Sequence, residues 1–377
     1  MARERPLLVL GIMSGTSIDA VDYALCEVSL TRVRLVKLCQ AKFPKLLRRR
    51  LHAAASNRAS SHEVGQLHHD LGRFYATHFR QGRSQSKPDL VGLHGQTVFH
   101  NPAPDGRASL QLGEPAYLSE ALRVPVVSNF RAADMAAGGQ GAPLATLFHR
   151  LAFGKPGQHV CVNNLGGISN VTSIDWRRGR RPALLAFDTG PANVLLDLGV
   201  RRFTGGRESF DRDGARGARG RHAETLVTDW LKHPFFRQRP PKSTGREVFG
   251  ESFFAQAMRK MSRLSPFDAL ATLTEFTARS LVLNYRLHLN SLPSTVILCG
   301  GGAANHHLVE RIRVNLQAMA RATNVVTCAE LGWPLQSVEP AAFALLAYYR
   351  WKRKPANIPG TTGAERPVLL GQITEAG

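Results

Sequence analysis

The stretch LLVLGIMSGTSIDAVD (residues 7–22) changes character in its middle. A first apolar run ends at Gly15-Thr16-Ser17, Asp19 and Asp22 follow, and a second apolar run begins at Tyr23. Two apolar runs joined by a turn of Gly, Ser and Thr predict a β-hairpin. The turn gathers backbone N–H groups, two hydroxyls and a carboxylate, which together can hold a phosphate and its Mg²⁺. These residues are also those of an ordinary turn, so the rest of the chain must decide between the two interpretations.

The length of the chain limits the number of domains, and its charge limits the classes of binding partner. The chain has 377 residues, which is enough for two domains of ordinary size. Its 49 Lys and Arg residues against 28 Asp and Glu residues give a formal charge of +21, which favours anionic partners. However, the basic residues are spread along the chain and no aromatic residues are interleaved with them, so nucleic-acid binding is not expected. We interpret the charge as a solvated surface with a bias towards anionic substrates.

The cysteines and the apolar segments predict that the protein is located in the cytoplasm. Five cysteines lie far apart and form no CxxC motif, which predicts a reduced, cytoplasmic protein without a disulfide framework or a zinc site. The N-terminus leads into the first strand without a signal-peptide cleavage site. The longest apolar stretch, near residues 341–349, is too short to span a membrane.

The order of predicted elements occurs twice along the chain. Strands are expected over 7–13, 23–30 and 33–39, and again over 159–163, 168–174 and 183–187, each time before alternating helices and strands. This order predicts a mixed sheet with helices packed on it. Its repetition predicts two similar α/β domains facing a ligand cleft. The Ala- and Gly-rich segment 131–144 between them suits a close domain crossing or a tight substrate wall.

Three glycine-bearing turns are predicted at strand ends. They are Gly15-Thr16-Ser17, Gly166-Gly167, and Gly300-Gly301-Gly302 with Asn305. Backbone N–H groups at such turns can bind phosphate, so three turns spread over both halves predict a nucleotide clamped between domains. The chain has no GxxxxGK[ST] and no GxGxxG after its first strand, which excludes a P-loop and a dinucleotide-binding fingerprint.

Asp188 is the predicted catalytic residue. It is expected to end an apolar strand, and the Thr-Gly-Pro turn that follows would aim its carboxylate away from the sheet edge. A carboxylate in that place could accept a proton from water or from a sugar hydroxyl. The structural alternative is an aspartate that caps the following helix or stabilises the turn.

His94, Arg131 and Glu339 are candidates for substrate binding. His94 is expected to end a strand, Arg131 could pair with a substrate carboxylate through its fork of donors, and Glu339 opens the last helix. The alternatives are a buried structural histidine, a surface arginine, and an acidic residue that is favourable at any helix N-terminus.

Nine motifs in order resemble those of the anhydro-N-acetylmuramic acid kinases of bacterial cell-wall recycling. The resemblance runs from about residue 7 to residue 347 and rests on GIMSGTSIDAVD, HGQTVFH, LQLGEPAYLSE, NFRAADMAAGGQGAPL, NNLGGISNVT, AFDTGPANVLLD, PKSTGRE, LATLTEFT and CGGGAANHHL. It implies membership of the sugar kinase, actin and heat-shock-70 superfamily.

The resemblance implies a fold and a reaction. The implied fold is α/β, with two ribonuclease-H-like domains, each a mixed sheet flanked by helices, around a central ATP cleft. The implied domains are residues 1–142, completed by residues 345–377, and residues 143–344. The implied enzyme is a homodimer that converts 1,6-anhydro-N-acetylmuramic acid, ATP and water into N-acetylmuramic acid 6-phosphate and ADP.

The resemblance also implies residue roles. The family's catalytic aspartate, in FDTGP, falls on Asp188, and Asp19 would hold Mg²⁺ directly or through water. The implied ATP-binding residues are Gly15, Thr16, Ser17, Ile18, Asp19, Ala20, Val21, Asp22, Gly166, Gly167, Gly300, Gly301, Gly302 and Asn305. Ala20 and Ala192 stand where relatives usually have glycine, so we expect strain if either residue needs a positive φ.

The chemistry of the implied substrate is consistent with a carboxylate base. In the anhydro sugar O6 is bonded to C1 and has no proton to lose, so water must attack C1 while O6 leaves. Asp188 can take the proton from that water. Two alternatives remain open, namely a related sugar kinase with a different acceptor, and a nucleotide- or nucleic-acid-binding homologue that has lost catalysis.

Overall fold

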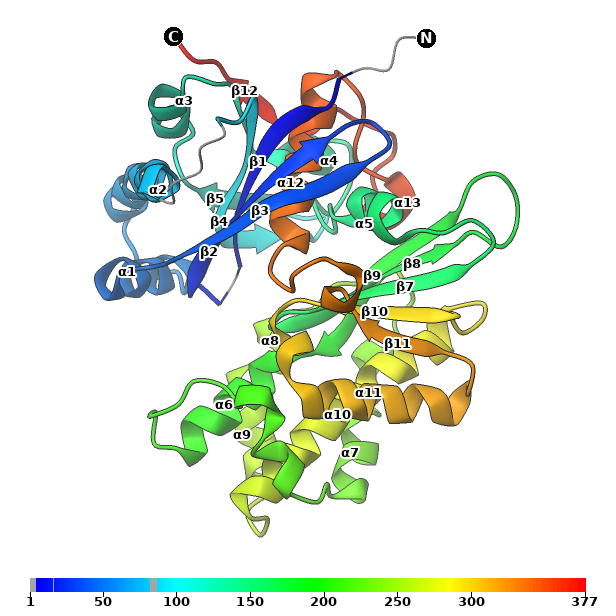
Figure 1. Cartoon of the computed structure of the whole chain (residues 1–377). Helices are drawn as coiled ribbons and strands as arrows, with labels where there is room; N and C mark the ends of the chain where they lie inside the picture. The colour runs from blue at the N-terminus through cyan, green and yellow to red at the C-terminus, as the bar shows by residue number, and fades with distance from the viewer. Residues whose placement is uncertain (1–4, 16, 82–86) are drawn as a thin grey trace. The chain divides into compact units, whose positions relative to one another are not determined.

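The computed structural model describes residues 5–15, 17–81 and 87–377, and the chain divides into two compact units (Figure 1). Unit 1 comprises Met1–Ala152 and Gln336–Gly377, and unit 2 comprises Phe153–Leu335. The boundaries expected after residues 142 and 344 differ from this division. Residue 344 lies inside helix α12 (Val338–Trp351), and this helix packs as one piece against the sheet of unit 1.

The described residues of unit 1 form a seven-stranded mixed sheet in the order β12-β6-β4-β1-β2-β3, with β5 paired to β4. The first three strands make an antiparallel meander, and β4 and β6 run parallel to β1. The strands are β1 (Leu7–Ser14), β2 (Ala20–Val28), β3 (Val33–Lys42), β4 (Leu90–Asn101), β5 (Ala108–Leu112), β6 (Val126–Ser128) and β12 (Gln372–Thr374). The hairpin predicted from residues 7–22 is therefore confirmed.

Helices pack on both faces of this sheet. Leu10 and Ile12 of β1 belong to a core that includes Leu67 and Leu71 of α2 (Ser61–Gln81). Residue 11 points to the opposite face because side chains alternate along a strand, and α12 lies against that face. The other helices of the described part of unit 1 are α1 (Lys45–Ala55), α3 (Ala116–Leu122), α4 (Phe130–Ala136), α5 (Thr146–Phe153, which crosses the unit boundary) and α13 (Pro359–Thr362).

Two paired glycines allow α12 to approach the sheet. Gly11 of β1 pairs with Gly92 of β4. A Cβ on Gly11 would lie 1.8 Å from the carbonyl oxygen of Pro340, and one on Gly92 would lie 2.3 Å from that of Phe343. The backbone of α12 thus rests directly on the strands, which fixes the position of Glu339 in the first turn of this helix.

Unit 2 repeats the same strand plan. Its described residues form a five-stranded sheet in the order β11-β10-β7-β8-β9, in which β7, β8 and β9 are an antiparallel meander and β10 and β11 run parallel to β7. The strands are β7 (His159–Leu165), β8 (Ile168–Asp175), β9 (Ala183–Pro191), β10 (Thr295–Cys299) and β11 (Asn324–Thr327). Two mixed sheets flanked by helices confirm the predicted α/β fold class.

The central helix of unit 2 is α10 (Pro266–His288), which begins with Ser265 accepting a hydrogen bond from the backbone N–H of Asp268 at 3.1 Å. Such an N-cap followed by proline is a common helix start. Its buried residues join the core of unit 2 with those of the neighbouring helices. The other α-helices of the described part are α6 (Asn193–Phe203), α7 (Glu224–Trp230), α8 (Arg246–Phe249), α9 (Glu251–Lys260) and α11 (His306–Met319).

Within the described ranges, no helix combines the length and apolar character needed to cross a bilayer.

Candidate functional site

The predicted phosphate turn connects β1 and β2 in unit 1. The carbonyl of Gly15 accepts a hydrogen bond from the N–H of Ile18 at 3.1 Å and another from Gln96 Nε2 at 3.2 Å. Ile18 is buried and has a φ of +56°, an unusual conformation for a β-branched residue. The strain expected at Ala20 is absent because Ala20 is the first residue of β2. Thr16 lies outside the described residues.

The two aspartates of the turn have different surroundings. Asp19 is exposed and its carboxylate pairs with Arg48 at 2.5 Å, whereas Ser17 is exposed beside it. Asp22 lies within β2, next to the buried Val21, and accepts a hydrogen bond from Gln40 Nε2 at 2.8 Å. Burial raises the pKa of Asp22 to about 6, against the opposing effect of that hydrogen bond. Of the two aspartates of the turn, Asp22 is therefore the one whose ionised form is disfavoured by burial.

Unit 1 brings His94, Arg131 and Glu339 together. His94 Nδ1 lies 2.8 Å from the carbonyl oxygen of Gly95, so Nδ1 carries the proton and Nε2 accepts from Arg131 at 3.0 Å. Burial, reinforced by the charge of Arg131, lowers the pKa of His94 to about 3, which keeps the ring neutral. Arg131 also donates to the carbonyl of Gly141 at 2.6 Å.

Glu339 interacts electrostatically with Arg131 and with Asp22. Burial and the nearby carboxylate of Asp22 raise the pKa of Glu339 to about 6, while Arg131 opposes the shift. Two carboxyl groups and one guanidinium are therefore close enough to influence each other in unit 1. Such mutual perturbation is common at functional sites.

The strand that carries His94 is longer than predicted. His94 does not end a strand, because β4 continues to Asn101 and its second half pairs with β5. Gln96, also in β4, was missed by the sequence reasoning. It is fully buried, and its Oε1 has no partner among the described residues. The available signal was an uncharged polar residue in an otherwise apolar strand, which must find hydrogen-bond partners when buried.

The segment 131–144 is partly helical, which the sequence reasoning did not predict. Helix α4 ends within it, and the fully buried Asp134 then organises the loop that follows. Its carboxylate accepts from the N–H of Gly141 at 2.9 Å, from Asn357 Nδ2 at 2.8 Å and from Thr362 Oγ1 at 2.7 Å. These bonds fix the carbonyl of Gly141 that Arg131 contacts.

Asp188 lies inside β9 of unit 2, not at its end as predicted. The register of β8 and β9 shifts at this point, since Asn170 pairs with Asp188 whereas Ser169 pairs with Gly190. This irregularity is a β-bulge, and bulges often re-aim side chains next to active sites. The Thr-Gly-Pro that follows stays in the strand because β8 continues to pair with it up to Pro191.

The segment 242–244 is hydrogen-bonded to both the backbone and the side chain of Asp188. The N–H of Asp188 donates to the carbonyl of Lys242 at 3.1 Å, and the N–H of Thr244 donates to Asp188 Oδ2 at 2.8 Å. Burial raises the pKa of Asp188 to about 7; the Thr244 N–H and Lys242 oppose the shift and Glu247 adds to it. A carboxylate with a pKa near neutrality is suited to act as a general base. The role of PKSTGRE in holding this carboxylate was not predicted.

The second and third glycine turns lie side by side in unit 2. Gly166 and Gly167 join β7 to β8, and their carbonyls accept hydrogen bonds at 3.0 Å from the N–H groups of Asn193 and Ala192, respectively. Gly300 has a φ of +77°, and a Cβ on it would lie 2.2 Å from Asn164 Oδ1, so glycine is required there. Ala192 does not have the positive φ that would strain it, since its φ is −119°.

The remaining residues of these turns differ in how much free space surrounds them and in whether their side chains are hydrogen-bonded. Beside Gly301 no atom would lie within 4 Å of an added Cβ, whereas a Cβ on Gly302 would lie 2.7 Å from Leu165 Cβ. Asn305 caps α11, since its Oδ1 accepts the N–H of Leu308 at 2.9 Å. The Asn305 side chain is therefore engaged by the helix, and its role in ATP binding stays a prediction.

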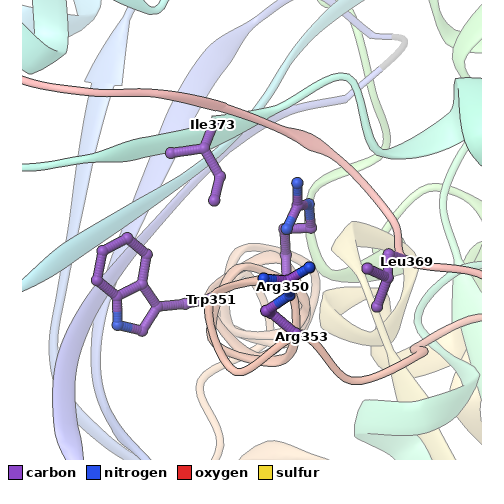
Figure 2. A pocket seen from close by; sticks show the side chains of 5 residues that line it. All are labelled: Arg350, Trp351, Arg353, Leu369 and Ile373. Carbon is purple, nitrogen blue, oxygen red and sulfur yellow. The ribbon is translucent and has the colours of Figure 1, made fainter.

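A separate cavity of about 350 Å³ lies at the C-terminal end of α12 (Figure 2). Its lining residues are Arg350, Trp351, Arg353, Leu369 and Ile373. Glu339 lies at the other end of the helix, roughly 18 Å away along the axis at 1.5 Å per residue. Because none of the predicted site residues lines this cavity, we do not include it in the candidate site.

In the part of the chain that the structure describes, no group of three or more His, Cys, Asp or Glu side chains is gathered to hold a metal ion.

Comparison with known proteins agrees with the sequence motifs. A family model described as anhydro-N-acetylmuramic acid kinase matches residues 7–376. A protein of Picosynechococcus sp. with the same name is 41% identical, over 97% of this chain and 98% of its own. Another of that name, from Cyanothece sp., is 40% identical over 97% and 98% of the two chains.

Similarity to solved structures is more distant. The activator of the 2-hydroxyisocaproyl-CoA dehydratase from Clostridium difficile is 11% identical and has a TM-score of 0.45, over 92% of this chain and 96% of its own. The family model and the relatives at about 40% identity both extend over nearly the whole sequence. The chain belongs to the anhydro-N-acetylmuramic acid kinase family.

Proposed function

We propose that this protein is an ATP-dependent kinase that opens 1,6-anhydro-N-acetylmuramic acid with water and phosphorylates O6. The products are N-acetylmuramic acid 6-phosphate and ADP. Membership of the family supports the substrate and the reaction type. The observation that carries the mechanism is the environment of Asp188, a desolvated carboxylate that the N–H of Thr244 holds in place at 2.8 Å.

In this mechanism Asp188 is the general base. It takes a proton from water as the water oxygen bonds to C1, and the C1–O6 bond breaks. O6 leaves with developing negative charge and bonds to the γ-phosphorus of ATP, while ADP departs. Asp188 then releases its proton to solvent. With its pKa near 7, Asp188 is a base strong enough to assist and is still largely ionised slightly above neutrality.

Backbone groups of the glycine turns are the proposed phosphate ligands. An added Cβ on Gly15 would meet no atom closer than 4.0 Å, and one on Gly167 or Gly301 would meet none within 4 Å. Bare backbone of this kind lets a phosphate approach N–H groups closely. We assign Gly15, Ser17 and the residues up to Asp22 to ATP in unit 1, and Gly166, Gly167 and Gly300–Gly302 in unit 2. Thr16 keeps the role that the resemblance implies.

The acidic residues of unit 1 fit Mg²⁺. The carboxylate of Asp22 makes ionisation of Glu339 less favourable, and a divalent cation relieves such repulsion between carboxylates. Mg²⁺ usually takes one or two carboxylates and completes its shell with phosphates and water. Asp22 is thus the better-placed ligand, since Asp19 is engaged with Arg48. When bound, Mg²⁺ would neutralise charge on the transferred phosphoryl group.

His94, Arg131 and Glu339 are the proposed sugar-binding residues. Arg131 uses two of its nitrogens for Gly141 and His94, and its Nε has no partner among the described residues. A buried donor without a partner is costly, and a substrate oxygen would satisfy it. We also keep two finer expectations as proposals. The enzyme acts in the cytoplasm, consistent with five cysteines that form no disulfide, and it forms a homodimer, which light scattering would test.

The test of the function is an ADP-release assay with the anhydro sugar as acceptor and Asp188→Asn as the blank. In ¹⁸O-labelled water, the product should carry the label at the C1 hydroxyl. Turnover of a simple sugar with no turnover of the anhydro sugar would instead support a kinase with a different acceptor. Label absent from C1 would contradict hydrolytic ring opening.

A further inference from the structure

Lys242 has a buried side chain that takes no part in the proposed catalytic steps. Only 5% of it is exposed, and the described residues place no carboxylate within ion-pair distance of its ammonium. Lysine is rarely buried to this extent without a partner. It belongs to PKSTGRE, the segment whose backbone holds Asp188.

The ammonium group of Lys242 is nevertheless hydrogen-bonded. Nζ lies 3.2 Å from the carbonyl oxygen of Phe235, 3.3 Å from that of Phe236 and 3.1 Å from Nε2 of His288. The two carbonyl oxygens therefore accept from the ammonium, which has N–H donors only. The Phe235 ring also lies under the charge, with its centroid 4.5 Å from Nζ, which favours a cation at this place.

These contacts anchor the segment that precedes Thr244. Lys242 reaches η3 (Pro234–Arg237) through the two carbonyls and α10 through His288, while its own carbonyl accepts the N–H of Asp188 at 3.1 Å. Two residues later, the N–H of Thr244 donates to the carboxylate of Asp188. The side chain of Lys242 thus connects two elements of unit 2, η3 and α10, to the backbone segment that orients Asp188.

We propose that Lys242 is a positioning residue for Asp188. The buried ammonium of Lys242 anchors the 242–244 segment and keeps a positive charge in the surroundings of the carboxylate. The inference rests on the proposed function, in which Asp188 is the base. The charged and titratable groups around this pair are Glu247 on α8, which disfavours the Asp188 anion, and His288 on α10. Burial, together with the charge of Lys242, lowers the pKa of His288, while the contact of its Nε2 with the carbonyl oxygen of Phe236 at 3.0 Å opposes this shift.

The positive charge of Lys242 favours the ionised form of Asp188. Lys242 lowers the pKa of Asp188 against the effects of burial and of Glu247, and without Lys242 the carboxylate would hold its proton to higher pH. A neighbouring opposite charge typically shifts a carboxyl pKa by about 1–3 units. Lys242 itself has its pKa lowered by burial to about 8, so it remains mostly charged at the pH where Asp188 titrates.

The experiment measures the titration of Asp188 directly. Protein labelled with ¹³C at the aspartate carboxyls is titrated by NMR, and the Asp188 resonance is assigned by its absence in Asp188→Asn. In Lys242→Met, a variant of similar length without the charge, we expect the midpoint of Asp188 to rise, because both the charge and the anchor of the Thr244 N–H are lost. Lys242→Arg keeps the charge, so its midpoint should remain nearer to that of the wild type.

Lys260→Met is the matched control, because it removes an exposed lysine of the same unit that pairs with Asp229 at 2.6 Å. It should leave the Asp188 midpoint unchanged. The acid limb of kcat/KM should move with the NMR midpoint in Lys242→Met and stay in place in the control. A purely structural lysine would lower stability and activity without moving either midpoint, and that outcome would overturn the inference.

Failure of the proposed function would look different. If the wild-type protein releases no ADP with the anhydro sugar, the reaction is wrong, yet the NMR titration still reports whether Lys242 acts on Asp188. An unchanged Asp188 midpoint in a folded Lys242→Met protein refutes the positioning role even if the kinase activity is confirmed. Circular dichroism and thermal unfolding establish that the variant is folded.

Discussion

Asp188→Asn should remove activity and at the same time stabilise the protein above neutral pH. The asparagine cannot take the proton from water, so turnover should fall by about 10²-fold or more, the usual contribution of a general base. The stability gain arises because the buried carboxylate is unfavourable as an anion. Its pKa is raised from 3.8 to about 7, mainly by burial.

The size of the gain follows from that shift. A rise from 3.8 to about 7 is about 3 units, or on the order of 4 kcal/mol at about 1.4 kcal/mol per unit. Below pH 4 the carboxyl is protonated in the folded and unfolded states, so the substitution changes little. Between pH 4 and 7 the folded state retains the proton that the unfolded state loses, so wild-type stability falls as pH rises. The full difference is reached above pH 7.

The assay is urea unfolding of the wild type and Asp188→Asn at several pH values between 4 and 8, read as the difference in unfolding free energy. Asp175→Asn is a control of opposite sign, because Arg177 holds the pKa of Asp175 below its ordinary value and the substitution should destabilise the protein. A difference curve for Asp188→Asn that is flat with pH would refute the desolvation argument. Retained turnover in this variant would refute the assignment of the base.

Three other predictions concern the same elements. In the wild type, kcat/KM should fall about tenfold per pH unit below about 7, since only ionised Asp188 accepts the proton, and a profile flat from pH 5.5 to 8 would contradict this. Gly92→Ala should lower the unfolding free energy by about 1–3 kcal/mol or more, because its Cβ would lie 2.3 Å from the carbonyl oxygen of Phe343. Gly65→Ala in α2 is the control for chemical denaturation; its Cβ meets nothing within 4 Å, so it should gain about 0.5–1 kcal/mol of helix propensity. Arg131→Met removes the donor to His94 and the charge that opposes protonation of Glu339, so it should raise KM for the sugar more than it lowers kcat. Initial-rate kinetics would test this, and a lower kcat with unchanged KM would speak against a binding role.

The local elements of both units could be predicted because each is recorded in adjacent residues. The hairpin follows from two apolar runs around Gly15, and α10 follows from its apolar period and from Ser265-Pro266 at its start. The strand plan of unit 2 could be predicted for the same reason. By contrast, α4 was not predicted, because Ala- and Gly-rich sequence has little apolar periodicity, and the loop after it depends on Asp134 bonding to distant residues such as Asn357.

The sequence by itself determined which residues we propose for the chemistry, namely the Gly15–Asp22 turn and Asp188, because motifs of residues suited to it occur in order along the chain. Only the tertiary structure decided how these groups are tuned. It placed Asp188 before a bulge inside β9 and set Thr244 and Lys242 against it. It also brought Asp22 within reach of Glu339. Desolvation and Coulomb interactions depend on distance in space, and residues far apart in sequence acquire such distances only when the chain folds.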